Sequence, residues 1–230
     1  MKTRIVLMTV ALACGALLMA QQVGEMTMEK EDAHNLVKVP SYSPYAGRNF
    51  PTQVYWGDTH LHTSKSLDAR AFGTILGPEE AYRFARGEEI TATHGMQVQL
   101  SRPLDWLVVA DHSDGMGAMN EIIKGDPNLL RDPTVRDWYE RLNQGGETAL
   151  MATMDIINAF ALGNIPEILI DEKFSKTIWD RYLDAAEAYN DPGVFTSIIG
   201  YEWTSTEDGN NLHRNVLYRD GKSLARQLLP

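Results

Sequence analysis

Residues 106–112 read Trp-Leu-Val-Val-Ala-Asp-His, an uninterrupted apolar run of strand length that ends in a carboxylate and an imidazole. A strand without polar alternation is typical of a sheet with both faces covered, as in parallel α/β proteins. β-Prone residues recur before and after this run, at 53–58, 195–200 and 215–218. The sequence therefore predicts four strands.

Helical patterns separate the predicted strands. Gly77-Pro78-Glu79-Glu80 predicts a helix start, with proline in the first turn and acids near the positive end of the helix dipole. Residues 115–192 are mostly helical in pattern, and 148–162, rich in Met, Ala and Ile, predict a buried helix. Strands that alternate with helices predict an α/β fold with a parallel sheet.

The composition of the 230-residue chain excludes several classes of protein. Hydrophobic residues make up 43% and charged residues 23%, as in an ordinary globular domain. The chain has 21 basic and 31 acidic residues and a net charge of -10, which argues against a nucleic-acid-binding surface. The one cysteine, Cys14, excludes an intrachain disulfide and a cysteine-built zinc site.

The N-terminus has the layout of a secretory signal peptide. Lys2 and Arg4 precede an apolar run that ends at Ala20, and this run is short for a membrane span of about 20 residues. We expect residues 1–20 to be removed near Ala20, which predicts a periplasmic or extracellular protein that is free of the membrane. Residues 21–52, with several Pro, Ser and Gly, predict an irregular lead-in segment.

Imidazoles and carboxylates stand where the predicted strands end or begin. His60-Leu61-His62 follows the first predicted strand, and side chains two residues apart in an extended segment point to the same side. Asp111-His112 and Glu202 follow two other strands, and His213 precedes the last. Because function gathers at the carboxyl ends of parallel strands, this placement predicts a divalent metal site of the Zn, Mn or Fe type.

Each of these signals has a structural alternative. A single His-x-His or Asp-His pair also occurs in surface turns, Glu202 can be a solvated strand end, and His213 can be a hydrogen-bonded loop histidine. His34 and His94 stand at no strand end and are interpreted as structural. A serine-hydrolase Gly-x-Ser-x-Gly elbow, a phosphate-binding glycine loop and a His-Glu-x-x-His helix are all missing from the sequence.

Four sequence blocks together resemble the PHP (polymerase and histidinol phosphatase) superfamily, in particular its secreted branch of uncharacterised function. They are Gly57–Thr63, Pro103–Asp114, Gly200–Thr204 and Asn211–Asn215. The resemblance implies a distorted seven-stranded β/α barrel of TIM type, with two or three divalent metals at the carboxyl ends of its strands. Residues 53–230 are the expected domain.

The resemblance also implies roles for individual residues. The implied metal ligands are His60, His62, Asp68, His112, Glu202 and His213, of which Glu202 bridges two metals. Asp111 is expected to orient its neighbour His112, and Asp58 to support the site. Arg214 is expected either to meet a substrate phosphate or to form a structural salt bridge.

The sequence departs from the family pattern at its C-terminal end. The family has a further His and a final Asp-x-His downstream, but no histidine follows His213, and about four of the seven barrel strands are recognisable. We therefore expect an incomplete barrel in an N-terminal portion of a longer protein.

Taken together, these features predict a metal-dependent hydrolase that acts on a small-molecule phosphate ester. One alternative is a binuclear hydrolase of the amidohydrolase type, which needs a metal-bridging lysine that no predicted strand end supplies. Another alternative is a non-catalytic exported metal-binding protein. The sequence does not predict the oligomeric state.

Overall fold

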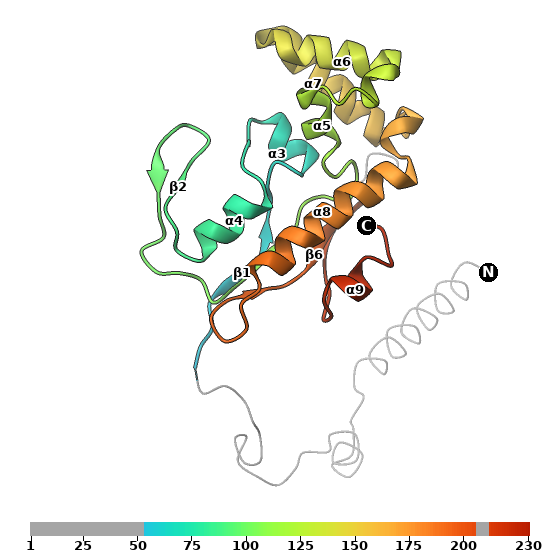
Figure 1. Ribbon diagram of the computed structural model, residues 1–230. Helices are drawn as coiled ribbons and strands as arrows, with labels where there is room; N and C mark the ends of the chain where they lie inside the picture. Colours follow the sequence, from blue (N-terminus) through green and yellow to red (C-terminus); the bar gives the residue numbers. More distant parts are fainter. Residues whose placement is uncertain (1–52, 206–211) are drawn as a thin grey trace, which may run out of the picture. The chain divides into compact units, whose positions relative to one another are not determined.

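The protein contains a parallel β-sheet (Figure 1). The computed structural model describes residues 53–205 and 212–230. The strands of the sheet are β1 (Gly57–Leu61), β4 (Trp106–Val109) and β5 (Thr196–Ser197), in the order β1-β4-β5 with both pairs parallel. This arrangement confirms the predicted α/β class. The expected leader at 1–20 and lead-in segment at 21–52 lie outside the described residues.

A separate two-stranded hairpin lies beside the end of β4. Strand β6 (Gly200–Ser205) pairs antiparallel with β7 (Leu212–Leu217), and an isolated parallel bridge joins His112 to Glu202 of β6. Gly200 permits this approach to β4, because a Cβ atom there would lie 2.5 Å from Val108 Cγ1. The start of β6 therefore lies against β4, and the middle of β6 lies beside the residues that follow β4.

The strand boundaries differ from those predicted. The first strand lies at Gly57–Leu61 rather than 53–58, because it pairs with β4 between Gly57 and Trp106 at one end and Leu61 and Val109 at the other. The predicted strand at 195–200 is divided between β5 and the start of β6. The last strand begins at Leu212 and is antiparallel to β6. The described residues form no closed barrel.

Seven α-helices are present in the described part of the chain. They are α3 (Leu67–Ala71), α4 (Pro78–Ala85), α5 (Ala118–Lys124), α6 (Pro133–Gln144), α7 (Gly146–Ala161), α8 (Glu172–Tyr189) and α9 (Lys222–Ala225), with 3₁₀ turns at Leu129–Arg131 and Glu167–Leu169. The predicted helix start at Pro78 and the helical region 115–192 are confirmed. Carboxylates cap two of the helices: Asp132 accepts from Thr134 N at α6, and Asp171 accepts from Phe174 N at α8. Among the described helices, none has the length and apolarity that a membrane crossing requires.

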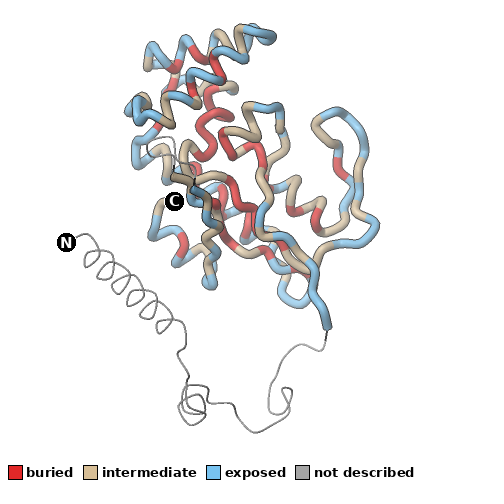
Figure 2. Tube along the Cα trace, turned by 180° about the vertical axis from the view of Figure 1, so that it is seen from behind, coloured by how far each residue is buried: buried red, intermediate tan, exposed pale blue. Residues whose placement is uncertain are grey.

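Two hydrophobic clusters form the core. One lies where α4 and α8 pack on the sheet and includes Tyr82, Leu107, Val109, Trp179 and Leu183, all nearly inaccessible to solvent. The other joins α3, α5, α6 and α7 around residues such as Met119, Ile122 and Trp138. Figure 2 shows the buried stretches running through the strands and the inner sides of these helices.

Helix α7 is less buried than its composition predicts. It covers the predicted helix at 148–162, and its buried residues are Ala152, Thr153 and Ile156. Leu150 and Met151 are more than half exposed. The prediction of a buried helix is therefore wrong for one of its faces, because α7 packs on its neighbours along a single side.

A second hairpin stands apart from the main sheet. Strands β2 (Ile90–Thr91) and β3 (Gln97–Val98) pair antiparallel, and the segment is mostly exposed (Figure 2). His94 lies exposed in its turn.

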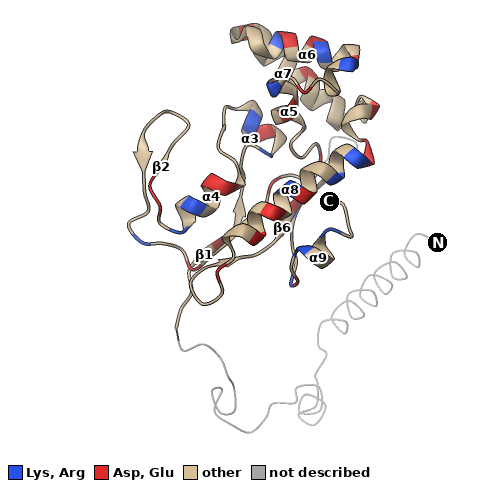
Figure 3. Cartoon of the chain, in the orientation of Figure 1, with Lys and Arg blue, Asp and Glu red and all other residues tan. Residues whose placement is uncertain are grey.

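Charged residues of both signs are interspersed on the outer helices (Figure 3). Acids and bases follow one another along α6 and α8, as in the ion pairs Arg141–Asp137 and Lys176–Glu172. These helices therefore carry mixed charge on their surfaces.

Candidate metal centre

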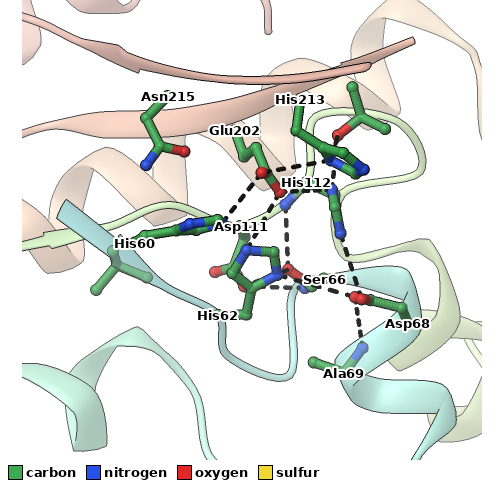
Figure 4. Close-up of polar contacts among 12 residues, drawn as sticks. His60, His62, Ser66, Asp68, Ala69, Asp111, His112, Glu202, His213 and Asn215 are labelled. Carbon is green, nitrogen blue, oxygen red and sulfur yellow. Dashed lines mark hydrogen bonds and ion pairs between the residues drawn. The ribbon is translucent and has the colours of Figure 1, made fainter. Parts of the chain in front are cut away.

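Four imidazoles surround the carboxylate of Glu202, which is almost fully buried (Figure 4). Its Oε1 atom lies 3.0 Å from His60 Nε2 and 3.3 Å from His213 Nδ1. Its Oε2 atom lies 3.2 Å from His62 Nε2 and 2.9 Å from His112 Nδ1. Residues from four separate parts of the sequence thus meet at one carboxylate.

The sheet brings these residues together in a way that follows from the chain directions. His60 lies in β1 and His62 just after it, two residues apart and on the same side. Glu202 N donates to Asp111 O at 2.9 Å, and Ser113 N donates to Glu202 O at 2.8 Å, which holds β6 beside His112. Because β7 runs antiparallel to β6, the first residues of β7 lie beside the last residues of β6, and His213 is paired with Thr204.

The possible ligands fall into three overlapping groups, in each of which the ligand atoms lie within 4.8 Å of one another. The groups are His60, His62 and Glu202; His62, Asp68 and His112; and His112, Glu202 and His213. Glu202 belongs to two of them, so its two oxygens can contact two cations. All six predicted ligands are therefore brought together, and each belongs to at least one group.

Asp68, at the start of α3, closes the side of the cluster opposite His60 (Figure 4). Its Oδ2 atom lies 3.3 Å from His112 Nε2, and its Oδ1 atom lies 3.9 Å from His62 Nδ1. The hydrogen bond from His112, together with the charge of that imidazole and the Ala69 N–H, lowers the pKa of Asp68 far below its ordinary value. Burial works to lower the pKa of His112, but the Asp68 hydrogen bond and the charges of Asp68 and Glu202 outweigh it, and the pKa is raised.

A buried serine determines which ring nitrogen of neutral His62 carries the proton. Ser66 Oγ donates to Asp111 Oδ1 at 2.8 Å and accepts from His112 N at 3.1 Å. The hydroxyl has one proton, which it gives to the carboxylate, so its 3.0 Å contact with His62 Nδ1 is accepted from an Nδ1–H group. In the neutral imidazole, this arrangement leaves the lone pair on Nε2, the atom that faces Glu202.

The environment of Glu202 Oε2 fits a bound cation. The atom is buried and has no hydrogen-bond partner: His112 Nδ1, 2.9 Å away, is hydrogen-bonded to Thr204 Oγ1, and His62 Nε2 is 3.2 Å away. A lone pair and a carboxylate oxygen repel each other unless a positive charge lies between them, and a buried carboxylate without a donor is costly. Imidazole nitrogens with carboxylate oxygens are the donor set of Zn, Mn and Fe sites.

Asp111 lies beneath the ligands and positions them. It is fully buried and accepts hydrogen bonds from Thr63 N at 2.5 Å, from Thr63 Oγ1 at 2.7 Å and from Ser66 N at 3.1 Å. Burial raises the pKa of Asp111, while the hydrogen bonds from Thr63 and Ser66 oppose that rise. Asp111 belongs to none of the three ligand groups, and its carboxylate holds the loop between His62 and Ser66 rather than the ring of His112, which it was predicted to orient.

Asp58 and Arg214 lie outside the ligand groups. Asp58 Oδ1 accepts from His60 N at 2.8 Å, which agrees with its expected supporting role. Arg214 is exposed on the strand face opposite that of His213, and its Nη1 donates to His213 O at 2.7 Å. The structure therefore does not bring the Arg214 guanidinium to the cluster.

Three residues at the site were given no role from the sequence, although Thr204 and Asn215 stand at the ends of two blocks that carry the resemblance. Ser66 is described above; Thr204 Oγ1 lies 2.6 Å from His112 Nδ1, and Asn215 Nδ2 donates to Thr59 O at 2.9 Å, which ties β7 to β1. Hydroxyl and amide side chains are common in any sequence, so the roles of these three residues become visible only from their hydrogen bonds in the structure.

Comparison with known proteins places these residues in a family. The family model described as "Protein of unknown function (DUF3604)" matches residues 49–230, a range that includes every residue of the cluster. No curated protein and no solved structure matches the chain. The chain therefore belongs to the DUF3604 family, whose function is unknown.

Proposed function

We propose that this protein is a divalent-metal-dependent hydrolase that cleaves phosphate esters. The observation that carries the proposal is the buried carboxylate of Glu202, whose two oxygens each contact two imidazole nitrogens and whose Oε2 atom has no hydrogen-bond partner. Such a carboxylate suits a bridge between two cations.

The residues present divide naturally between two cations, with Asp68 available for a third. His60 and His62 would hold one cation with Glu202, and His112 and His213 the other. A pair of divalent ions about 3.5–4 Å apart lowers the pKa of water and stabilises the charge that develops on phosphoryl oxygens. The donor set is that of Zn, Mn or Fe.

The other residues hold the ligands in place and leave one side open. Ser66 and Asp111 fix His62, so that its Nε2 atom faces Glu202. Glu202 itself is shielded from water, whereas the side chains of His60 and Asp68 are 53% and 49% exposed. A substrate would therefore approach between His60 and Asp68.

Two observations favour phosphate esters over amides. The amidohydrolase alternative needs a lysine among the metal ligands, but Lys65, which lies in the loop that carries Ser66, directs its Nζ atom to Glu121 Oε1 at 3.6 Å. The sequence blocks around His60, His112 and Glu202 also resemble those of the PHP superfamily. With a net charge of -10 and Arg214 facing away, the attraction for a phosphate would come from the cations.

The proposal has two further parts. The first is that the described strands belong to a distorted β/α barrel, and the second is that the protein acts after export. The order β1-β4-β5, with β6 beside the end of β4, supports the first part, because it puts the ligands at one edge of a parallel sheet. The charged and then apolar stretch from Lys2 to Ala20 supports the second part.

The test is hydrolysis of p-nitrophenyl phosphate by the full chain loaded in turn with Zn, Mn and Fe. We expect turnover that a chelator abolishes, loss of at least about 100-fold in Glu202→Gln, and no loss in the matched variant Glu79→Gln on the exposed side of α4. Bound metal without hydrolysis of any ester would favour a metal-binding protein, and hydrolysis of amides alone would favour the amidohydrolase alternative.

A further inference from the structure

An apolar pocket of about 250 Å³ adjoins the metal cluster. Its walls come from the end of β1, the loop before α4, α4 itself and the β2–β3 hairpin. The apolar residues of these walls include Leu61, Leu76, Ala81, Phe84, Ile90 and Val98. His62, one of the six predicted ligands, also lines this pocket, so the pocket and the cluster have a residue in common.

Exposed apolar side chains flank the segments that form the pocket. Phe72 is 78% exposed and Ile75 is 57% exposed, on either side of the lining residue Thr74. Met96, in the β2–β3 turn, is 64% exposed and precedes β3. Exposed apolar residues in the same segments as an apolar pocket favour a binding site over a surface without function.

The chemistry of the pocket complements that of the cluster. A cluster of imidazoles and carboxylates with bound cations attracts an anionic group, whereas the pocket offers almost no polar partner. A ligand that occupies both must therefore carry a charged end and an apolar end. A cavity of about 150 Å³ lined by aliphatic and aromatic side chains holds a benzene molecule, so this pocket has room for one ring with its linking atom.

We propose, on the basis of the proposed function, that this pocket binds the apolar alcohol portion of the substrate. The substrate class is then a phosphate monoester of an aromatic or short aliphatic alcohol, with its phosphate at the Glu202 end of the cluster and its apolar portion beside His62. The β2–β3 hairpin forms the outer wall through Ile90 and Val98, which are paired across its two strands.

The decisive comparison is between benzyl phosphate and methyl phosphate, because their leaving alcohols have similar basicity and differ in apolar surface. With the metal-loaded full chain, kcat/KM is expected to be at least about tenfold higher for benzyl phosphate. Ala81→Phe, which fills the pocket from α4, should remove this preference by lowering kcat/KM for benzyl phosphate to the value for methyl phosphate. Val98→Phe fills the pocket from the hairpin and is a second variant should the first fail to fold.

Glu79→Phe is the matched control, since it adds the same side chain at an exposed position of the same helix. It should leave both rates and the bound metal unchanged. Equal rates for the two esters in the wild-type protein would overturn the pocket assignment and leave the proposed hydrolase standing.

Calorimetric titration with benzylphosphonate and methylphosphonate provides a readout that needs no turnover. Benzylphosphonate should bind at least about tenfold more tightly, and Ala81→Phe should abolish the difference. If no ester is hydrolysed but this difference persists, the pocket is supported and the hydrolase is not. Equal affinities, or no binding of either compound, would overturn the pocket assignment.

Discussion

Replacing Ser66 by alanine tests the network that holds the ligands. The Ser66 hydroxyl donates to Asp111 and accepts from His62 Nδ1 and His112 N. In the alanine variant, His62 Nδ1–H and His112 N–H would both lose their acceptor. Ser66 is fully buried, so water does not replace the hydroxyl at that position. Each such unpaired group costs about 1–3 kcal/mol, and water can reach part of the His62 ring, so we expect the metal-free protein to lose about 2 kcal/mol of stability.

The larger expected effect of Ser66→Ala is on metal affinity. Without Ser66, His62 is free to rotate and to exchange its tautomer, and loss of such a supporting hydrogen bond lowers metal affinity by about 10- to 100-fold. Zn affinity would be measured against a competing chelator, and stability by urea unfolding of the metal-free protein.

Ser64→Ala is the matched control for Ser66→Ala. Ser64 is equally buried in the same loop, and its hydroxyl makes no hydrogen bond to another described residue. It should bind Zn like the wild type. If the two variants bind Zn with affinities within twofold of each other, the argument that Ser66 fixes His62 is wrong.

Three further predictions concern other parts of the site. Glu202→Gln should reduce bound Zn by at least one equivalent by elemental analysis, since Glu202 belongs to two ligand groups; unchanged stoichiometry would exclude a bridging role. Tyr182→Phe should destabilise the protein by about 1–3 kcal/mol in urea with little change in Zn affinity, because the Tyr182 hydroxyl donates to Val109 O and accepts from Asp111 N; a stability loss below about 0.5 kcal/mol would refute this. In the metal-free protein, the lowered pKa of Asp68 stabilises the fold, and this stabilisation is lost as the pH falls below about 3.9. The raised pKa of His112 also stabilises the fold, and this stabilisation is lost as the pH rises above about 6.5. Asp68→Asn should therefore reduce stability between these limits by up to about 1 kcal/mol, because Asp68 is half exposed, and an unchanged pH profile of unfolding would contradict the pairing.

The features of the fold that could be predicted from the sequence are those set by local chemistry. The apolar run at Trp106–Ala110 contains β4, and Pro78 begins α4 as its neighbours predict. The boundaries of β1 and the direction of β7 could not be predicted in this way, because they depend on pairing with β4 and β6. The exposed face of α7 depends likewise on which neighbours are present.

The candidate site was predictable where the residue type itself carries the signal. The chain has only six histidines, and four of them, His60, His62, His112 and His213, are placed near strand ends, as is Glu202; all five residues meet in the structure. Asp68 entered only through the family resemblance. Ser66, Thr204 and Asn215 are ordinary polar residues whose importance lies in their contacts across 9 to 156 residues of chain.

The position of bound cations tests the central claim most directly. Crystals of the full chain grown with Zn or Mn would be measured at the absorption edge of the metal. We predict an anomalous peak about 2.0–2.2 Å from both His62 Nε2 and a Glu202 carboxylate oxygen, with a second peak near His112 and His213. Strong density for the side chains with no peak beside Glu202, at saturating metal, would contradict the claim that this carboxylate holds cations.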